Sequence, residues 1–294
     1  MEVTIGIPAF NEEKNIASII LKLKKITNKI IVCDDGSKDL TGNIAKELGA
    51  TVITHEKNLG YGAGIRSIFL KAKEMNVEIL VTFDADGQHR IEDVEKIITP
   101  LKNNSADIVI GSRFLDKNDT KEVPRYRKIG IKAITKLTNS SLNEKLTDSQ
   151  SGLRGYNQKV LQAITPSEQG MGVSTEILIK SNIKNFKIVE IPIKVLYDRD
   201  TSTHNPVLHG TSVILSTMKF ISIEHPLKFY GIPGLIFLIT GLFFILWTLQ
   251  IFGESRQIIT NISLIGIGAT IIGIILMVTS ILLFSLVNVV RERN

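Results

Sequence analysis

Short apolar runs alternate with helical patterns along the first two thirds of the chain. Runs of about five apolar or β-branched residues are typical of strands buried on both faces of a parallel sheet. We expect strands at residues 3–8, 29–33, 50–54, 79–83, 106–110 and 187–195. Their alternation with helical patterns predicts an α/β fold with a doubly wound, mostly parallel sheet.

Apolar residues three and four positions apart mark the helices between these strands. The first helix follows Asn11-Glu12-Glu13, where a capping residue precedes acidic residues in the first turn. Further helices are expected at residues 41–48, directly after residues 58–64, around residues 94–101 and at residues 173–183. Residues 58–64 are rich in glycine, and a plain tight turn and a phosphate-binding loop explain them equally well.

Two later stretches break the alternation of strands and helices. Residues 114–150 are polar and basic, and we expect a mobile or membrane-facing segment there. Residues 206–223 carry many apolar side chains and few charges. A helix in the bilayer interface and a helix packed beneath the soluble domain are equally good interpretations of this second stretch.

The C-terminal part of the chain is far more apolar than the rest. Residues 229–253 and 257–290 are stretches of 25 and 34 residues without a charge. Each is longer than the ~20 apolar residues that a bilayer requires, so we expect two transmembrane helices. The predicted organisation is a soluble domain at residues 1–200, a juxtamembrane segment at 201–228 and a transmembrane hairpin at 229–290.

The charges around these helices predict their orientation. Lys219, Lys228, Arg291 and Arg293 flank one side of the predicted hairpin, as the positive-inside rule expects of the cytoplasmic side. The chain also starts directly on a strand pattern, with no pattern of a signal peptide before the soluble domain. We therefore expect a multi-pass protein of the cell membrane whose soluble domain is cytoplasmic.

Composition limits the chemistry. The single Cys33 cannot form an internal disulfide, and the five histidines show no zinc-ligand spacing. The net charge of +6 fits a protein held against anionic lipid, although solvated lysines are the commoner cause of such a value. We expect no nucleic-acid partner, and a homo-oligomer, if formed, would use the membrane helices.

One apolar run ends abruptly in acidic residues. The stretch Ile79–His89 contains Asp84, Asp86 and Gln88 just after the expected strand, at the edge where open α/β sheets bind ligands. These side chains offer only hard oxygen ligands, which suit Mg²⁺ or Mn²⁺. Two solvated aspartates in a polar loop are an equally good explanation of this motif taken alone.

Five short motifs occur in one order across the soluble domain. They are Ile7-Pro8-Ala9-Phe10-Asn11-Glu12, Asp34-Asp35-Gly36-Ser37, Asp84-Ala85-Asp86-Gly87-Gln88-His89, Gly111-Ser112-Arg113 and Ser151-Gly152-Leu153-Arg154-Gly155. In this order they resemble family 2 glycosyltransferases, specifically the dolichyl-phosphate and polyprenyl-phosphate type. The resemblance implies a GT-A nucleotide-sugar-binding fold. It also implies an enzyme that supplies lipid-linked sugar for glycan assembly, with residues 114–150 on the acceptor side.

The resemblance further implies roles for individual residues. Binding of the nucleotide sugar falls to Pro8, Ala9, Phe10, Glu12, Asp34, Asp35, Asp84, Ala85 and Asp86. The metal, Mg²⁺ or Mn²⁺, falls to Asp84, Asp86 and Gln88. The acceptor phosphate falls to Arg113, Arg127 and Arg154, and catalysis to Asp86, Arg113 and Arg127. Arg125 is an equally good candidate for the role given to Arg127.

Departures from the family narrow the reaction. The chain lacks the Gln-x-x-Arg-Trp signature of processive polysaccharide synthases, since Trp247 lies in a predicted membrane helix. Residues 197–206 look more like archaeal members that use UDP-linked sugars than like mannosyl-transferring members. We therefore expect an inverting transfer of a hexose or N-acetylhexosamine from a UDP-sugar to dolichyl or polyprenyl phosphate. GDP-mannose as donor, a hydroxyl acceptor and a non-catalytic binding protein are the alternatives.

The acceptor decides whether a base is required. A lipid monophosphate with a second pKa of about 6 is largely ionised at pH 7, so its attacking oxygen needs no strong base. A hydroxyl acceptor would need one, and Glu176 is the candidate. The favoured interpretation of Glu176 is a helix residue that contacts a sugar hydroxyl or solvent.

Overall fold

The described residues of the computed structural model are 1–116, 123–196, 214–215, 217–223, 225–257 and 259–292. They belong to two compact units, residues 1–217 and residues 218–294. The first unit holds a sheet, and the second holds two long apolar helices. The predicted domain boundary at residue 200 and the first part of the predicted juxtamembrane segment, residues 201–213, lie outside the described residues.

The first unit is built on a seven-stranded sheet in the order β3-β2-β1-β4-β6-β5-β7. The strands are β1 (Val3–Ala9), β2 (Ile30–Asp34), β3 (Thr51–Thr54), β4 (Ile79–Thr82), β5 (Ile108–Ser112), β6 (Arg154–Asn157) and β7 (Ile188–Pro192). Neighbouring strands are parallel, except that β6 runs antiparallel to both β4 and β5. The prediction of a mostly parallel sheet is confirmed, and β6 is an addition, because its short sequence contains no apolar run.

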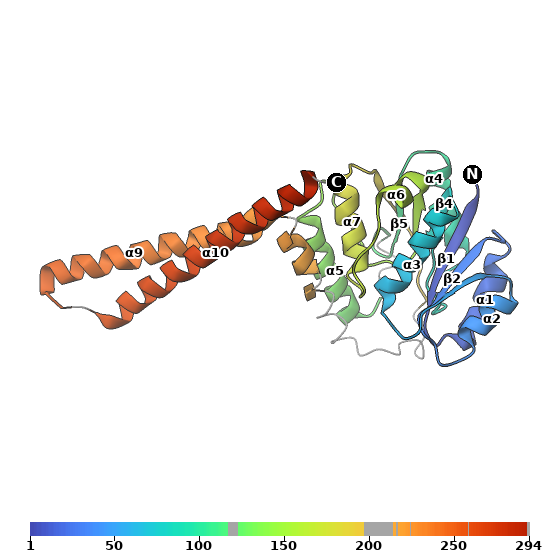
Figure 1. The fold of residues 1–294 in the computed structure, drawn as a ribbon, viewed down its shortest axis with the longest axis horizontal. Helices are drawn as coiled ribbons and strands as arrows, with labels where there is room; N and C mark the ends of the chain where they lie inside the picture. The colour runs from blue at the N-terminus through green and yellow to red at the C-terminus, as the bar shows by residue number, and fades with distance from the viewer. Residues whose placement is uncertain (117–122, 197–213, 216, 224, 258, 293–294) are drawn as a thin grey trace. The chain divides into compact units, whose positions relative to one another are not determined.

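Helices cover both faces of this sheet (Figure 1). One face packs against α1 (Glu13–Leu23), α2 (Thr41–Glu47) and α4 (Glu92–Lys102). The other packs against α3 (Tyr61–Glu74), α6 (Gln158–Ala163) and α7 (Val173–Ile183). A further helix, α5 (Arg125–Asn139), lies beside α7. The apolar side chains therefore form two cores, one on each face of the sheet.

Successive residues of β1 face opposite sides of the sheet. Ile5 and Ile7 are fully buried in the core shared with α1, α2 and α4. Gly6 lies between them and faces α3, where a Cβ atom would come 2.4 Å from Ile68 Cγ2. Because only glycine leaves room for this contact, α3 packs closely against the centre of the sheet.

The strand register brings the ends of several strands together. The residue pairs Ala9–Asp34 and Gly6–Thr82 place the C-terminal ends of β2 and β4 beside that of β1. The antiparallel β6 begins with Arg154 opposite Thr82. The residues that precede Arg154 therefore cross the same edge of the sheet, which a parallel strand would not allow.

The polar stretch 114–150 contains α5, which the sequence analysis did not predict. Of this stretch, residues 117–122 lie outside the described residues. Ile134 and Thr138 are buried on one side of α5, whereas Lys132 is exposed. The apolar positions of α5 are few and lie between lysines and arginines, so the basic composition concealed an amphipathic helix.

The second unit contains a π-helical turn, η2 (Leu227–Gly231), and the helices α9 (Ile232–Ser255) and α10 (Thr260–Glu292). Both long helices are apolar and long enough to cross a membrane, and few of their residues are buried. They pack against each other through small residues, since a Cβ atom on Gly241 would come 2.6 Å from the backbone nitrogen of Thr270. These features are those of a membrane-associated protein.

Candidate active site

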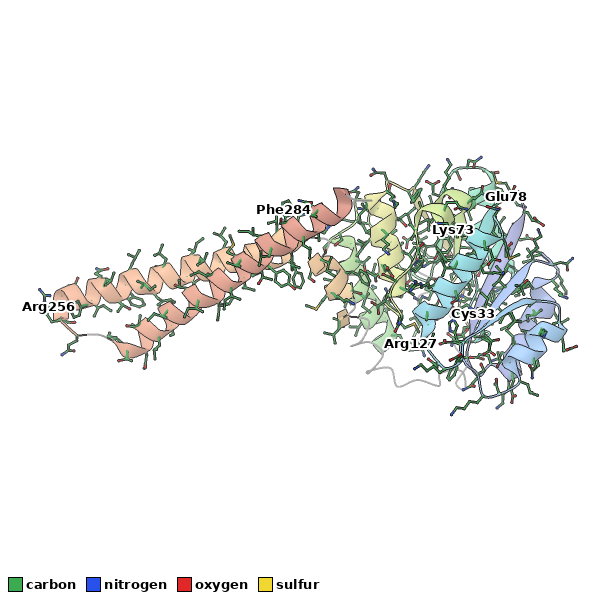
Figure 2. All side chains as sticks on the ribbon, in the orientation of Figure 1. Cys33, Lys73, Glu78, Arg127, Arg256 and Phe284 are labelled. Carbon is green, nitrogen blue, oxygen red and sulfur yellow. The ribbon has the colours of Figure 1, made fainter. Side chains whose placement is uncertain are left out.

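Two acidic motifs meet at the C-terminal edge of the sheet, where open α/β sheets bind ligands. Asp35 follows β2 directly, and Asp84 lies two residues beyond the end of β4. Figure 2 shows Cys33 of β2 and Arg127 of α5 toward one end of the first unit, with Glu78, which precedes β4, at the other end. The basic start of α5 therefore lies on the side of the unit where the acidic motifs gather.

Both oxygens of the Asp84 carboxylate have protein partners. The hydroxyl of Tyr61 donates to Oδ1 at 3.0 Å, and Nε2 of His89 lies 3.3 Å from Oδ2. Burial alone would raise the pKa of Asp84, but the hydrogen bond and charge of His89, the Tyr61 bond and the charge of Arg113 lower it overall. Asp84 is therefore held in its ionised form.

Asp86 lies in a more repulsive environment. It accepts a hydrogen bond of 3.0 Å from the backbone N–H of Gln88. Burial and the charge of Asp84 raise the pKa of Asp86, while the charge of Arg127 acts in the opposite direction. Burial and the charge of Asp86 raise the pKa of Glu12. A side-chain hydrogen bond lowers it by less, so the pKa is raised overall. Three acidic groups therefore create a negative field that a cation would relieve.

The other predicted residues of the first and third motifs lie at this edge with little exposure. Ala9 and Ala85 are buried, and Pro8 is buried within β1. The carbonyl of Ala9 accepts a hydrogen bond from the backbone of Asp35 at 2.9 Å, which joins the first two motifs. Phe10 is half-buried, and it is the largest side chain of the first motif that a ligand could contact.

The carboxylates of the second motif are engaged within the fold. Asp34 accepts a hydrogen bond from the backbone of Ser37 at 3.1 Å. Asp35 binds Nδ1 of His55 at 2.6 Å and accepts a bond from the backbone of Gly60 at 2.8 Å. Both side chains are buried. A nucleotide contact by Asp35 would therefore be made alongside these bonds, whereas Asp34 serves the turn after β2.

Arg113 pairs with an acidic residue that the sequence analysis did not single out. Its Nε and Nη2 donate to the two carboxylate oxygens of Asp148 at 2.6 and 2.8 Å. Burial would raise the pKa of Asp148, but the charge and hydrogen bonds of Arg113 lower it. The guanidinium of Arg113, which was predicted to bind a phosphate, therefore binds Asp148. Arg113 acts on the site through its charge near Asp84.

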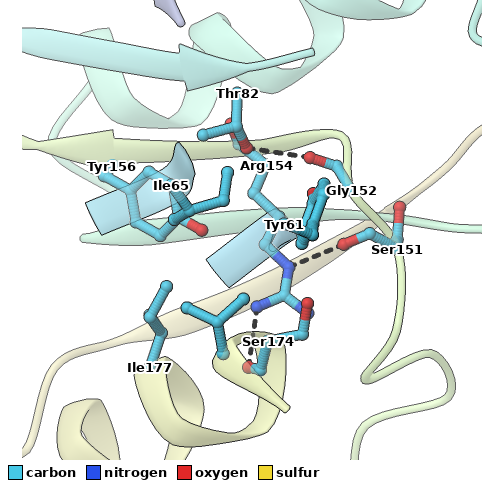
Figure 3. Close-up of a pocket in the computed structure, with 10 residues that line it drawn as sticks. Tyr61, Ile65, Thr82, Ser151, Gly152, Arg154, Tyr156, Ser174 and Ile177 are labelled. Atoms are coloured by element: carbon cyan, nitrogen blue, oxygen red, sulfur yellow. Dashed lines mark hydrogen bonds between the residues drawn. The ribbon is translucent and has the colours of Figure 1, made fainter. Parts of the chain in front are cut away.

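The predicted phosphate contact of Arg154 is wrong. The side chain is 2% exposed, and its guanidinium donates to the backbone carbonyls of Ser149, Ser151 and Ser174 at 2.6, 2.8 and 2.9 Å. Figure 3 shows it beneath Tyr61, beside a cavity of about 10 Å³ that has room for roughly one water molecule. The antiparallel strand β6 carries this arginine inward, and its guanidinium binds backbone carbonyls instead of facing a ligand.

The structure also bears on Glu176 and on the two interpretations of the glycine-rich turn. Glu176 is fully buried, accepts bonds from the backbone of Ser167 and Glu168, and pairs with Lys180 at 2.7 Å. It is therefore shielded from solvent, and its carboxylate oxygens bind protein donors. Residues 167–170 also approach the start of α3. In a phosphate-binding loop, the first N–H groups of α3 would bind the phosphate. The carbonyl of Gln169 already accepts from two of those N–H groups, which favours a structural turn.

The donor set fits a cation that is completed by substrate. Asp84 and Asp86 supply hard carboxylate oxygens, and Gln88 follows them in the same loop. Within the described part of the chain, no three His, Cys, Asp or Glu side chains cluster so as to enclose an ion. Mg²⁺ and similar ions commonly bind through one or two carboxylates together with substrate phosphates, so these two carboxylates could hold such an ion when a diphosphate is bound.

Comparison with known sequences identifies the family. Residues 4–165 match the family described as Glycosyl transferase family 2, which is more than half of the chain. The chain belongs to glycosyl transferase family 2. It is therefore a glycosyltransferase, and the motifs at the sheet edge fall inside the matched residues.

Characterised relatives of this family 2 chain occur in archaea. It is 34% identical to a UDP-N-acetylglucosamine–dolichyl-phosphate N-acetylglucosaminyltransferase of Methanococcus voltae, over 73% of this chain and 91% of that one. It is 28% identical to a dolichyl-phosphate hexose transferase of Haloferax volcanii, over 77% of this chain and 96% of that one. The relatives therefore include dolichyl-phosphate glycosyltransferases.

Solved structures confirm the fold of this family 2 enzyme. Glucosyl-3-phosphoglycerate synthase of Mycobacterium tuberculosis in complex with UDP matches with a TM-score of 0.57 and 20% identity. The match covers 74% of this chain and 79% of that one. Other structures of that synthase contain Mn²⁺ with UDP-glucose or Mg²⁺ with UDP. The predicted GT-A fold is therefore confirmed.

Three residues at the site were not assigned roles from the sequence. Tyr61 and His89 bond to Asp84, and Asp148 binds Arg113. The position of Tyr61 inside the glycine-rich turn and of His89 in the acidic motif gave a weak signal. Asp148 gave none, because its role depends on the pairing of β6 with β4 and β5.

Proposed function

We propose that this enzyme transfers a hexose or N-acetylhexosamine from a UDP-sugar to dolichyl or polyprenyl phosphate. The observation that carries the proposal is the acidic pair Asp84 and Asp86 at the sheet edge, with Arg127 close enough for its charge to act on Asp86. A cation held by the carboxylate pair would stabilise the diphosphate of the donor, and an arginine beside the pair would bind a phosphate acceptor. The archaeal relatives named for dolichyl-phosphate acceptors support the same assignment.

In this proposal, residues of the chain position the cation and the nucleotide sugar. Asp84 and Asp86, with Gln88 beside them, would hold Mg²⁺ or Mn²⁺, which supplies Lewis-acid stabilisation of the departing diphosphate. Phe10 and Asp35, with Glu12 beside them, would place the nucleotide at the ends of β1 and β2. The charges of Arg113 and Arg127 stabilise the negative charge that develops around this edge.

The acceptor needs no base from the protein. An ionised oxygen of the lipid phosphate attacks the anomeric carbon of the sugar, and the bond from that carbon to the diphosphate oxygen breaks. The nucleoside diphosphate leaves with the bonding electron pair, and the configuration at the anomeric carbon inverts. A hydroxyl acceptor would lose a proton at this step, and the buried, fully engaged Glu176 does not accept it.

The membrane helices complete the proposal. The hairpin of α9 and α10 would anchor the enzyme as a multi-pass protein, with the first unit in the cytoplasm, where nucleotide sugars are available. The first unit would meet the phosphate head group of its acceptor at the bilayer surface. A homo-oligomer would form through the same hairpin.

The experiment that tests the proposal is a transfer assay with the full-length protein. Purified enzyme is incubated with radiolabelled UDP- and GDP-sugars and polyprenyl phosphate, and lipid-extractable label is measured. We expect label from a UDP-sugar. Label from GDP-mannose alone would overturn the donor, and label on a hydroxyl acceptor alone would overturn the acceptor.

A pair of variants on α5 tests the acceptor site. Arg127→Ala should raise the KM for polyprenyl phosphate or lower kcat about tenfold or more, because a charge-assisted bond is worth ~1.5–3 kcal/mol. Lys132→Ala removes an exposed charge from the same helix and should leave both constants within about twofold, since solvated charges contribute little. Equal effects of the two variants would contradict a specific role for Arg127.

A further inference from the structure

The orientation of Asp84 is set by its neighbours. Tyr61 holds one oxygen and His89 the other, at 3.0 and 3.3 Å. On a third side, a Cβ atom on Gly152 would come 2.0 Å from Oδ2 of Asp84, so the carboxylate lies directly against the backbone there. A carboxylate has about four lone-pair positions, and two of these are committed to protein donors.

Tyr61 is itself fixed by the backbone around it. It is the first residue of α3, and the backbone N–H groups of the residues before and after it both donate hydrogen bonds. The N–H of Gly60 donates to Asp35 at 2.8 Å, and the N–H of Gly62 donates to the carbonyl of Gln169 at 2.7 Å. The phenol therefore starts from a backbone position with little freedom to move.

The loop that holds Gly62 is anchored in turn by Glu176. This carboxylate accepts from the backbone of Ser167 at 2.8 and 3.0 Å and of Glu168 at 2.8 Å. A Cβ atom on Gly62 would come 2.2 Å from the carbonyl oxygen of Glu168, which shows how closely the loop approaches α3. A continuous set of contacts thus runs from Glu176 through this loop to Tyr61 and Asp84.

We propose that Tyr61 is a positioning residue that orients the Asp84 carboxylate for the divalent cation. The inference rests on the proposed function, because it assumes that Asp84 and Asp86 share a cation. By fixing one oxygen, Tyr61 holds the carboxylate in a single rotamer whose remaining lone pairs are available to the cation. Without the hydroxyl, the carboxylate gains freedom that it loses again when the cation binds.

The chain offers a matched control in Tyr156. This residue lines the same small cavity as Tyr61 (Figure 3). It is 1% exposed, and its ring packs edge-to-face on that of Phe69, with the ring centroids 4.9 Å apart. Its hydroxyl is a neighbour of Arg154 and Thr82. Removing it disturbs the same cavity without removing a donor to Asp84.

The test measures cation binding rather than turnover. Mn²⁺ is titrated into full-length wild-type, Tyr61→Phe and Tyr156→Phe proteins in detergent with UDP present, and free Mn²⁺ is followed by electron paramagnetic resonance. We expect Tyr61→Phe to weaken Mn²⁺ binding about three- to tenfold, the range for loss of one hydrogen bond, and Tyr156→Phe to leave it unchanged. The thermal unfolding midpoint of each protein checks that the variants are folded.

The outcomes separate the inference from the proposed function. Wild-type Mn²⁺ affinity in folded Tyr61→Phe would overturn the positioning role while leaving the cation site intact. Equal weakening in both variants would also overturn it, since the effect would then belong to the cavity. Absence of Mn²⁺ binding by the wild-type protein would remove the cation site itself and, with it, the proposed function.

Discussion

Asp86 is the residue on which the proposed chemistry depends most. Asp86→Ala should lower transfer at least about a hundredfold, in line with the loss of one strong electrostatic contact in other active sites. The unfolding midpoint should change little, because Asp86 lies in a loop after β4 and is not part of either core. A radiolabel transfer assay with circular dichroism melting measures both quantities.

Two controls accompany this variant. Glu95→Gln removes an exposed carboxylate from α4 and should leave transfer unchanged. Excess EDTA should reduce wild-type transfer to the level of Asp86→Ala. Full activity after exhaustive removal of divalent ions would show that the two carboxylates serve another purpose.

Sequence reasoning at the residue scale succeeded where a side chain follows a strand end. Asp84 and Asp86 come directly after an apolar run, so their place at the edge follows from the pattern. Arg154 and Glu176 could not be placed in this way, because charged residues are assumed to be exposed. Both are buried and hydrogen-bonded to backbone groups, which lie 3 to 20 residues away from Arg154 and 8 to 9 residues away from Glu176.

At the scale of elements, the antiparallel strand β6 brings the residues that precede it, including Gly152, to the site. A substitution at Gly152 tests this role. Gly152→Ala should displace Asp84, because the new Cβ atom would come 2.0 Å from its carboxylate. We expect Mn²⁺ affinity and transfer both to fall at least about tenfold, the cost of a poorly placed ligand. Gly130→Ala on α5 is the control, since nothing lies within 4 Å of its added Cβ atom. Unchanged Mn²⁺ affinity in Gly152→Ala would mean that the carboxylate moves aside freely.

A second prediction at this scale concerns acid stability. Burial would raise the pKa of Glu176, but hydrogen bonds from Lys180 and Ser167 lower it below its usual value. Its stabilising contribution is therefore fully present above about pH 4.3, the pKa of the unfolded chain, and is lost as pH falls through the lower folded value.

Glu176→Gln should make this contribution independent of pH. At neutral pH the variant should be less stable by ~1–3 kcal/mol, the cost of leaving buried donors poorly satisfied. The difference from wild type should shrink as pH falls below about 4.3. Urea unfolding at several pH values measures it, and a constant difference across the range would contradict the assignment.

The elements themselves were predicted unevenly. The strands of the parallel part and most helices followed from periodicity, because each needs only a local pattern. The helix α5 was missed because its five basic residues are spread among its apolar positions and made the stretch read as polar. Strand β6 was missed because four residues that include Arg154 and Gly155 become a strand only when β4 and β5 leave a gap for them.

At the scale of the whole molecule, the proposed function assigns binding to the first unit and anchoring to the second. Deleting residues 229–294 should leave a folded first unit that still binds UDP, because both cores lie within residues 1–217. Transfer to long-chain polyprenyl phosphate in vesicles should fall at least about tenfold, since the acceptor is no longer held near the enzyme. Transfer to a short, water-soluble acceptor should be retained. Undiminished turnover on the vesicle-embedded acceptor would contradict the anchoring role.

The order in which the chain is synthesised gives β6 a further consequence. Strands β4 and β5 follow each other in sequence, yet in the finished sheet they are separated by β6. A nascent chain that has emerged only as far as Ser112 therefore has no partner strand for the inner edges of β4 and β5. Unpaired edges invite pairing with other chains, so this stage of synthesis is the most prone to aggregation. We expect chaperone dependence to concentrate there and to end once residue 157 has left the ribosome, before either membrane helix is made.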